Sequence, residues 1–96
     1  MVKVAANMYV KQESVDEFLK TAKELVEKTN KLDDGCNKYE LCRDKEDALH
    51  FMMLEEWKDQ QSLDNHMKSE HFTTLLPIMD GFRSQPSVLT ILDKVF

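Results

Sequence analysis

The order in which two hydrophobic periodicities follow one another constrains the fold of this chain more than any other feature. Apolar and polar residues alternate from Val2 to Val10, a period of two that is typical of a β-strand. From Val15 to Val26 apolar residues recur every three or four positions, which indicates an amphipathic helix. The segment Ser14–Glu17 reads S-x-x-E, a capping box that predicts the start of this helix. The DDG run that ends at Gly35 predicts its end, with Gly35 free to adopt a positive φ.

The rest of the chain continues the alternation of elements. We expect strands over Asn37–Arg43, Leu49–Trp57 and Val88–Val95, a helix capped by Asp59, and a helical run over Phe72–Met79 that Pro77 kinks or interrupts. The resulting order, β-α-β-β-α-β, is that of the ferredoxin-like α+β fold, in which the strands form one four-stranded antiparallel sheet. At 96 residues the chain has room for one domain only, spanning residues 1–96.

Both faces of the predicted sheet carry apolar residues, which bears on the oligomeric state. In the strand 49–57, Phe51 and Met53 fall on one face and Met52 and Leu54 on the other. Two helices cover only one face of a four-stranded sheet, so the second face would be a large exposed apolar patch. The sequence therefore predicts a homodimer in which two sheets pack face to face as a dimeric α/β barrel.

Composition and charge exclude several classes of partner. The net charge is −5, so nucleic acid and anionic membranes are poor partners, since phosphate binding needs a basic face. No stretch approaches the roughly 20 apolar residues of a membrane span. The N-terminus enters a strand pattern directly, so we expect no signal peptide and a cytoplasmic location. Cys36 and Cys42 lack a metal-binding spacing and are expected to be reduced thiols.

Five polar or aromatic residues interrupt otherwise apolar surroundings and are candidates for a site. Asn7, Glu55, Trp57, His66 and His71 could converge on an apolar pocket between the sheet and the second helical half. Structural roles are open as well: Asn7 could bond a neighbouring backbone, Glu55 could pair with a lysine at the sheet edge, and Trp57 could be core. His66 and His71 are five residues apart, so they do not share one helix face, and no metal site is predicted from them.

The longest informative segment carries a family resemblance. It runs EEWKDQQSLDNH from Glu55 to His66, is followed by SEHF at residues 69–72, and is preceded by GCNKYEL at 35–41. With the apolar stripe of Phe18–Val26, this set resembles the antibiotic biosynthesis monooxygenase family over roughly residues 2–82. The fold of that family is a dimeric ferredoxin-like barrel, which agrees with the order of elements and the homodimer predicted above.

The resemblance implies a small oxidoreductase, a cofactor-independent monooxygenase that oxidises phenols, quinols or polyketide-like aromatics with O2. Such a protein must supply a base, a dry pocket and hydrogen-bond donors for the developing oxyanion. By this resemblance Asn7 and Trp57 would be donors, His66 or His71 the base, and Glu55 a second base or an orienting group. We expect the walls of the substrate site to include Tyr39, Phe72 and Met53 beside Trp57.

Three alternatives stay open within the same fold. Similar proteins degrade haem with a histidine ligand on the last helix, but here the corresponding region reads Leu75-Leu76-Pro77. Others process a phosphorylated signalling furanone of the autoinducer-2 type, and this chain has only two arginines, Arg43 and Arg83, for a phosphate. A third class binds a metabolite without converting it, since a fold alone does not define chemistry.

Overall fold

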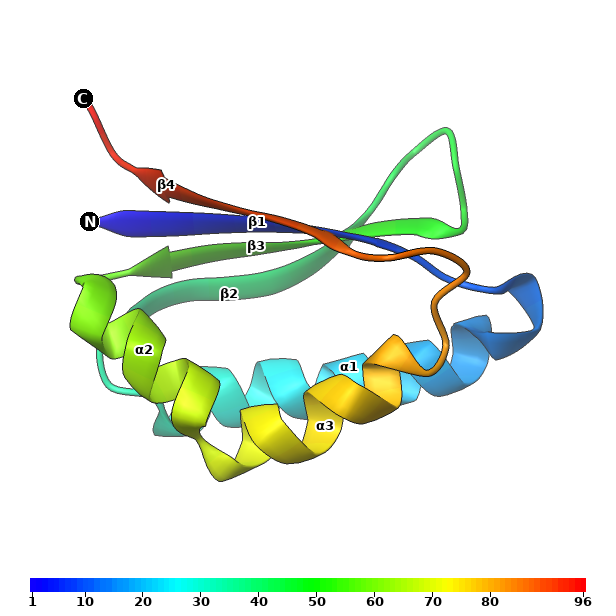
Figure 1. The fold of residues 1–96 in the computed structure, drawn as a ribbon, viewed down its shortest axis with the longest axis horizontal. Helices are drawn as coiled ribbons and strands as arrows, with labels where there is room; N and C mark the ends of the chain where they lie inside the picture. The colour runs from blue at the N-terminus through cyan, green and yellow to red at the C-terminus, as the bar shows by residue number, and fades with distance from the viewer.

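The computed structural model describes all residues, 1–96, and shows the predicted order of elements (Figure 1). The elements are β1 (Val2–Tyr9), the 3₁₀ turn η1 (Gln12–Ser14), α1 (Val15–Leu32), β2 (Cys36–Arg43), β3 (His50–Trp57), α2 (Gln60–Lys68), α3 (Glu70–Asp80) and β4 (Val88–Asp93). The strands form one antiparallel sheet in the order β2-β3-β1-β4, which confirms the predicted α+β, ferredoxin-like fold.

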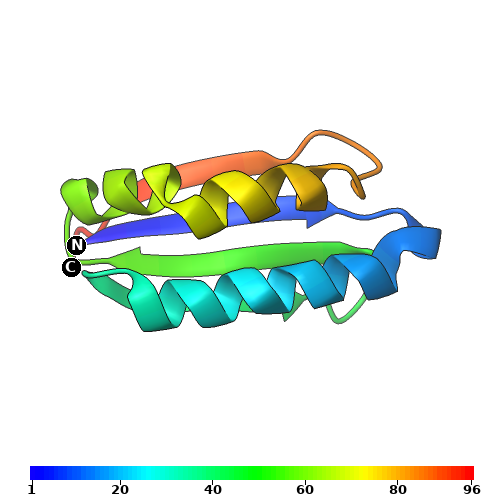
Figure 2. The same cartoon turned by 90° about the horizontal axis from the view of Figure 1, so that it is seen from below.

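The helices all lie on one face of the sheet, and the other face is open. Figure 2 shows α1 beside the α2–α3 pair across this one face. The alternation of β3 follows from this arrangement: Phe51, Met53, Glu55 and Trp57 are buried beneath the helices, while the residues between them are half-buried on the open face. None of the helices has the length and hydrophobicity that crossing a bilayer requires.

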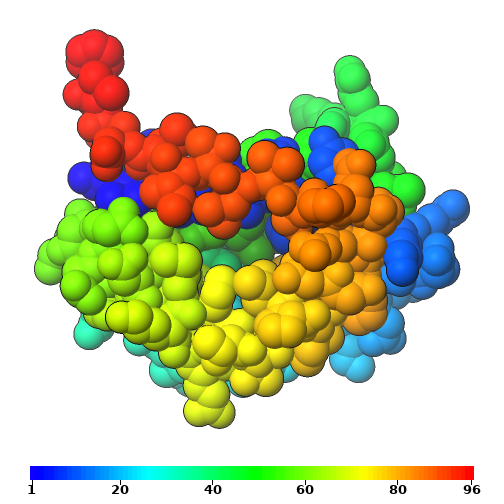
Figure 3. All heavy atoms as spheres, viewed as in Figure 1, coloured from blue at the N-terminus to red at the C-terminus, as the bar shows by residue number.

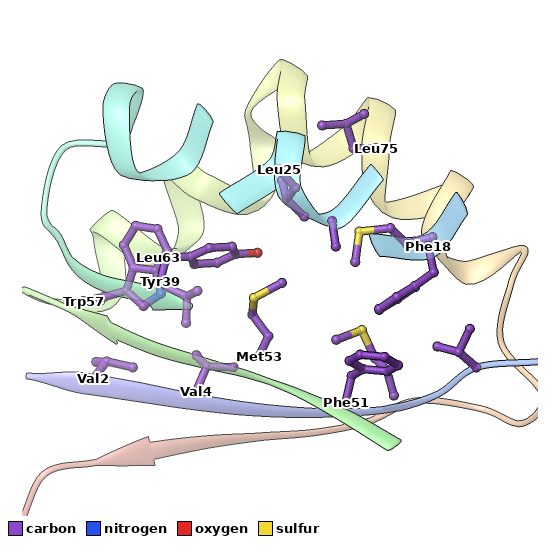
Figure 4. Packing of buried hydrophobic residues seen from close by; sticks show 14 residues of the cluster. Val2, Val4, Phe18, Leu25, Tyr39, Phe51, Met53, Trp57, Leu63 and Leu75 are labelled. Carbon is purple, nitrogen blue, oxygen red and sulfur yellow. The ribbon is translucent and has the colours of Figure 1, made fainter. Parts of the chain in front are cut away.

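The core fills the space between the helices and the sheet. In Figure 4, Trp57, Tyr39 and Leu63 gather at one end, Phe18 and Phe51 at the other, and Met53 lies between them. Burial of such side chains contributes roughly 1.5–3 kcal/mol each to the free energy of folding. The core therefore fixes the position of β3 against the helices, and with it the side chains that alternate along β3.

The helices begin and end where the sequence predicts, but the Ser14 capping hydrogen bond is absent and Pro77 does not interrupt the last helix. Ser14 makes no capping hydrogen bond with its side chain, because its backbone is near-helical (φ −107°, ψ −1°) and the 3₁₀ turn precedes α1 directly. Asp59 does cap α2, accepting from the Ser62 N–H at 2.9 Å, and Gly35 has the predicted positive φ of 80°. The last helix continues past Pro77 to Asp80, and the Gly81 N–H donates to the Pro77 carbonyl in its final turn.

β4 is the edge strand beside β1, and all six of its residues are exposed. The β1–β4 register puts Leu89 opposite Ala6 and Ile91 opposite Val4. Because paired residues point to the same side of a sheet, these two side chains lie on the helix-covered face, although they are 55% and 46% exposed. Val88, Thr90 and Leu92 lie on the open face. The monomer thus leaves apolar surface on both sides of this edge.

Candidate functional site

Two small adjoining hollows lie between the sheet and the helical pair α2–α3, near β4. Their volumes are about 30 Å³ and 60 Å³, and both are lined by Glu55, Phe72 and Leu89. The space-filling view shows the surface hollowed between β4 and the two helices (Figure 3). Other lining residues are mostly apolar: Val4, Leu63, Met67 and Ile91 with His66 in the smaller hollow, and Ala6, Met8, Leu25, Tyr39, Met53, Leu76 and Met79 in the larger.

Glu55 is the one carboxylate that lines both hollows. Its side chain is held on β3 beneath the helices, and its Oε1 accepts a hydrogen bond of 2.9 Å from the indole N–H of Trp57. Burial raises the pKa of Glu55 to about 7, although the hydrogen bond from Trp57 acts in the opposite direction. A carboxyl group with this pKa exists in both protonation states near neutral pH, which suits acid–base chemistry.

His66 lies inside an aromatic cluster at the edge of the smaller hollow. Its ring centroid is 4.7 Å from that of Trp57, 5.1 Å from Tyr39 and 4.9 Å from Phe72. Burial lowers the pKa of His66, opposed by its hydrogen bond to Asp33. Burial also raises the pKa of the Tyr39 hydroxyl, with the nearby Glu55 carboxylate as a second cause. Both groups are therefore held in their neutral forms by the apolar surroundings.

Asp33 determines which nitrogen of His66 carries the proton. His66 Nδ1 lies 2.6 Å from the Asp33 carboxylate, a distance at which Nδ1–H donates to the oxygen. The other ring nitrogen, Nε2, is buried and has no hydrogen-bond partner in the protein. In the neutral ring Nε2 is thus an unpaired acceptor, and this arrangement of carboxylate, imidazole and free nitrogen is that of a general base.

His71 joins the same carboxylate from the other side. Its Nε2 lies 3.0 Å from Asp33, and its ring centroid is 5.9 Å from that of His66. It does not line the hollows beside Glu55 but borders a separate one of about 230 Å³ between α1 and α3. Of the two histidines predicted as bases, only His66 therefore lines an apolar hollow beside Glu55.

Asn7 was expected to face the same pocket, and its placement corrects that expectation. It pairs in register with Met52 on the open face of the sheet, because odd-numbered residues of β1 point away from the helices. There its Oδ1 lies 2.8 Å from Nε2 of His50, whose Nδ1 is 2.9 Å from Asp44. The ring of Tyr9 stacks on His50 with centroids 4.5 Å apart. Asn7 thus belongs to a separate polar cluster.

The structure also adds residues that the sequence did not single out. The sequence pattern assigns Asp33 only to a helix end, but in the structure its carboxylate lies within hydrogen-bonding distance of both histidines. Topology could have indicated this role: β2 and β3 are antiparallel, so the junction that precedes β2 lies beside the junction that follows β3, where the Lys58 N–H donates to the Gly35 carbonyl at 2.8 Å. Leu89 and Ile91 of β4 had no signal beyond being apolar.

Comparisons with known proteins give a matching family and several similar chains. A profile of the antibiotic biosynthesis monooxygenase family matches residues 1–76. The Bacillus subtilis (strain 168) protein named "Putative monooxygenase YcnE" is 33% identical over 72 residues, which is 75% of each chain. The crystal structure of an antibiotic biosynthesis monooxygenase is 39% identical, with a TM-score of 0.93 over 99% of both chains. A conserved protein from Methanosarcina mazei Go1 is 35% identical, with a TM-score of 0.94 over 97% of this chain and 91% of the other.

Proposed function

Because the chain belongs to the antibiotic biosynthesis monooxygenase family, we propose that it oxidises a small phenolic or quinol-like aromatic with O2 and without a bound cofactor. One observation carries the proposal: His66, whose Nδ1 is held by Asp33 and whose buried Nε2 has no partner, lines an apolar hollow that Glu55 also lines. A buried base in a dry pocket is what the activation of a phenol requires.

The reaction balances without a further reductant. The base takes the phenolic proton, and the electron-rich phenolate gives one electron to O2. The resulting radical pair combines to form a carbon–oxygen bond at a ring carbon that bears hydrogen, ortho or para to the phenolate oxygen, as a peroxide that takes up a proton. Loss of the hydrogen of that same carbon as a proton and cleavage of the O–O bond then give the quinone, or the hydroxyquinone from a quinol, and water. One oxygen atom ends in the product and the other in water.

The role that we propose for each residue in the reaction follows from its position. His66 Nε2 accepts the phenolic proton, and Asp33 holds the ring in the tautomer that leaves Nε2 free. Protonated Glu55, which its raised pKa of about 7 makes available, donates to the developing peroxide. Tyr39, Phe72 and Met53 form walls against the aromatic ring. The indole N–H of Trp57 is donated to Glu55, so Trp57 orients that carboxyl group instead of binding O2.

We propose that the protein acts as a homodimer, in which a second copy of the chain supports the substrate site. The hollows of about 30 Å³ and 60 Å³ are small for an aromatic ring, and β4 beside them is exposed along its whole length. The methionines that line them, Met8, Met53, Met67 and Met79, are flexible side chains that can move aside for a ligand. A partner packed against the open sheet face would cover Val88 and Leu92 and support β4 from behind.

The test is oxygen uptake with a panel of reduced quinones and phenols, for the wild type and His66→Ala. The proposal expects turnover in the wild type and a rate at least about 100-fold lower in the variant, the lower range for loss of a general base. His50→Ala serves as the matched control, because His50 lies in the other polar cluster. Equal rates for wild type and His66→Ala would remove His66 from the mechanism. Ligand-induced thermal stabilisation without oxygen uptake would favour a metabolite-binding protein instead.

A further inference from the structure

Asp33, His66 and His71 form a cluster of three metal-binding side chains at the meeting point of α1, α2 and α3. One ligand atom from each residue lies within 4.8 Å of the others. We propose that this cluster is a site for one divalent first-row transition-metal ion of the zinc type, bound by two imidazoles and one carboxylate. Imidazole and carboxylate are ligands that suit such ions, and a water molecule would complete the coordination.

The break between α2 and α3 is what brings the two histidines together. On one continuous helix, residues five apart point in different directions, so the sequence predicted no metal pair. In the structure α2 ends at Lys68 and Ser69 is extended (ψ 154°) before α3 begins at Glu70. The chain direction changes at this point, and Nδ1 of His66 and Nε2 of His71 reach Asp33 at 2.6 Å and 3.0 Å.

The charge of the cluster favours a cation. The Asp33 side chain is only 9% exposed, and its ion-pair partners are the two histidines, with no lysine or arginine among them. A buried carboxylate needs a cation, a metal ion or protonated neighbours. The third histidine of the chain differs, because its partner Asp44 is 36% exposed and solvated. The Asp33 cluster is therefore the better candidate for a buried cation.

The dimensions allow an ion after a small adjustment. Ligand atoms at the usual 2.0–2.2 Å from a tetrahedral zinc ion stand about 3.3–3.6 Å apart. The Asp33 oxygen would move away from both rings by less than about 1 Å to reach these separations from the observed 2.6 Å and 3.0 Å. The two imidazole nitrogens lie within 4.8 Å of each other, so they would approach by up to about 1.5 Å. On the His71 side the cluster borders the hollow of about 230 Å³, through which an ion would enter; its wall carries Glu70 and the ion pair of Glu24 with Lys28, 3.1 Å apart.

Occupancy of this site has a consequence for His66. An ion on Nδ1 replaces the proton that Asp33 accepts, so the proton of the neutral ring moves to Nε2. Nε2 then becomes a donor and is no longer a base. The metal site stands independently of the proposed function, but if both hold, the ion inhibits the monooxygenase reaction without entering the hollow beside Glu55.

The experiment is a titration of chelator-treated protein with Co²⁺, followed by visible absorption and by calorimetry. We expect one equivalent of Co²⁺ to bind per chain and to give the intense visible absorption bands of tetrahedral Co²⁺. Asp33→Asn and His71→Gln each lose a ligand and should bind at least about 10-fold more weakly, since even outer-shell changes cost 10–100-fold. His50→Gln should bind like the wild type. Cys36→Ser is a second control, because Cys36 is three residues from Asp33 and could bind cobalt as a thiolate.

A spectroscopic measurement on the wild type keeps the proposal falsifiable if a variant fails to fold. Zn²⁺ should shift the ¹⁵N resonances of His66 Nδ1 and His71 Nε2 and leave those of His50 unchanged. Absence of cobalt binding, equal affinity in Asp33→Asn, or loss of binding only in His50→Gln or Cys36→Ser would overturn the proposal. If cobalt binds as expected and oxygen uptake is unaffected, the role of His66 as base fails and the metal site stands.

Discussion

Trp57 and Glu55 are joined by a hydrogen bond of 2.9 Å between the indole N–H and the carboxylate, two residues apart on the same face of β3. Trp57 is completely buried, so the bond fixes Glu55 in an apolar surrounding where its charged form is disfavoured. The carboxyl group can be kept there because it is protonated over part of the physiological pH range.

This burial predicts that stability falls as the pH rises. The pKa of Glu55 is raised from 4.5 to about 7, so between these values the folded protein binds more protons than the unfolded chain. The free energy of unfolding should therefore decrease from about pH 5 to pH 8, by up to roughly 3 kcal/mol from this residue. The Glu55→Gln variant should not show this decrease in the free energy of unfolding and should be more stable than the wild type at pH 8, measured by urea denaturation. Glu56→Gln, on the open face, should keep the wild-type slope, and an identical slope in Glu55→Gln would contradict the prediction.

Asp33→Asn should lower oxygen uptake through the tautomer of His66. The neutral amide can donate to Nδ1, which then holds the proton on Nε2 and removes the base. We expect kcat to fall by about 100-fold with little change in KM. Asp34→Asn is the matched control, because Asp34 is adjacent and exposed. A rate unchanged by Asp33→Asn would show that the carboxylate has no part in positioning His66.

Gly35→Ala should destabilise the junction between α1 and β2. Gly35 has a φ of 80°, and a Cβ added there would lie 2.1 Å from the Ser62 Oγ. Strain and overpacking together should cost about 1–3 kcal/mol or more. Gly81→Ala is the comparison, since its φ is −65° and the nearest heavy atom to a Cβ is 3.2 Å away. Thermal unfolding of both variants measures the difference, and equal losses would show that the Gly35 backbone can relax.

Leu92→Lys should dissociate the proposed dimer. Leu92 is 46% exposed on the open face of β4, where a partner's sheet would cover it, and an unpaired charge there costs roughly 1–3 kcal/mol or more. Light scattering should give a dimer for the wild type and at least about 10-fold weaker association for the variant. Ile78→Lys has the same starting exposure of 46% on α3 and should stay dimeric. A wild type that is monomeric at all concentrations would end the dimer proposal.

The fold was predictable because the first strand and the first helix have distinct periods and the order of the elements is typical of one fold. The alternation of β1 and the stripe of α1 each admit one secondary structure, and their order leaves one common fold. The site was harder to predict, because it depends on the face of the strand on which a residue lies and on contacts between segments distant in the sequence. Asn7 was assigned to the wrong face, since both faces of β1 carry apolar residues. Asp33 was missed because a carboxylate after a helix has the same sequence pattern whether it is solvated or, as here, holds two histidines 33 and 38 residues away.

Because β4 is exposed, the wall that it contributes to the site depends on dimer formation and therefore on protein concentration. Leu89 lines both hollows and Ile91 the smaller one, yet in the isolated chain β4 pairs with β1 alone. If a partner supports that wall, dilution below the dissociation constant of the dimer weakens it while the Asp33–His66 pair stays intact. Rate per subunit should then decline on dilution even though the base is still in place.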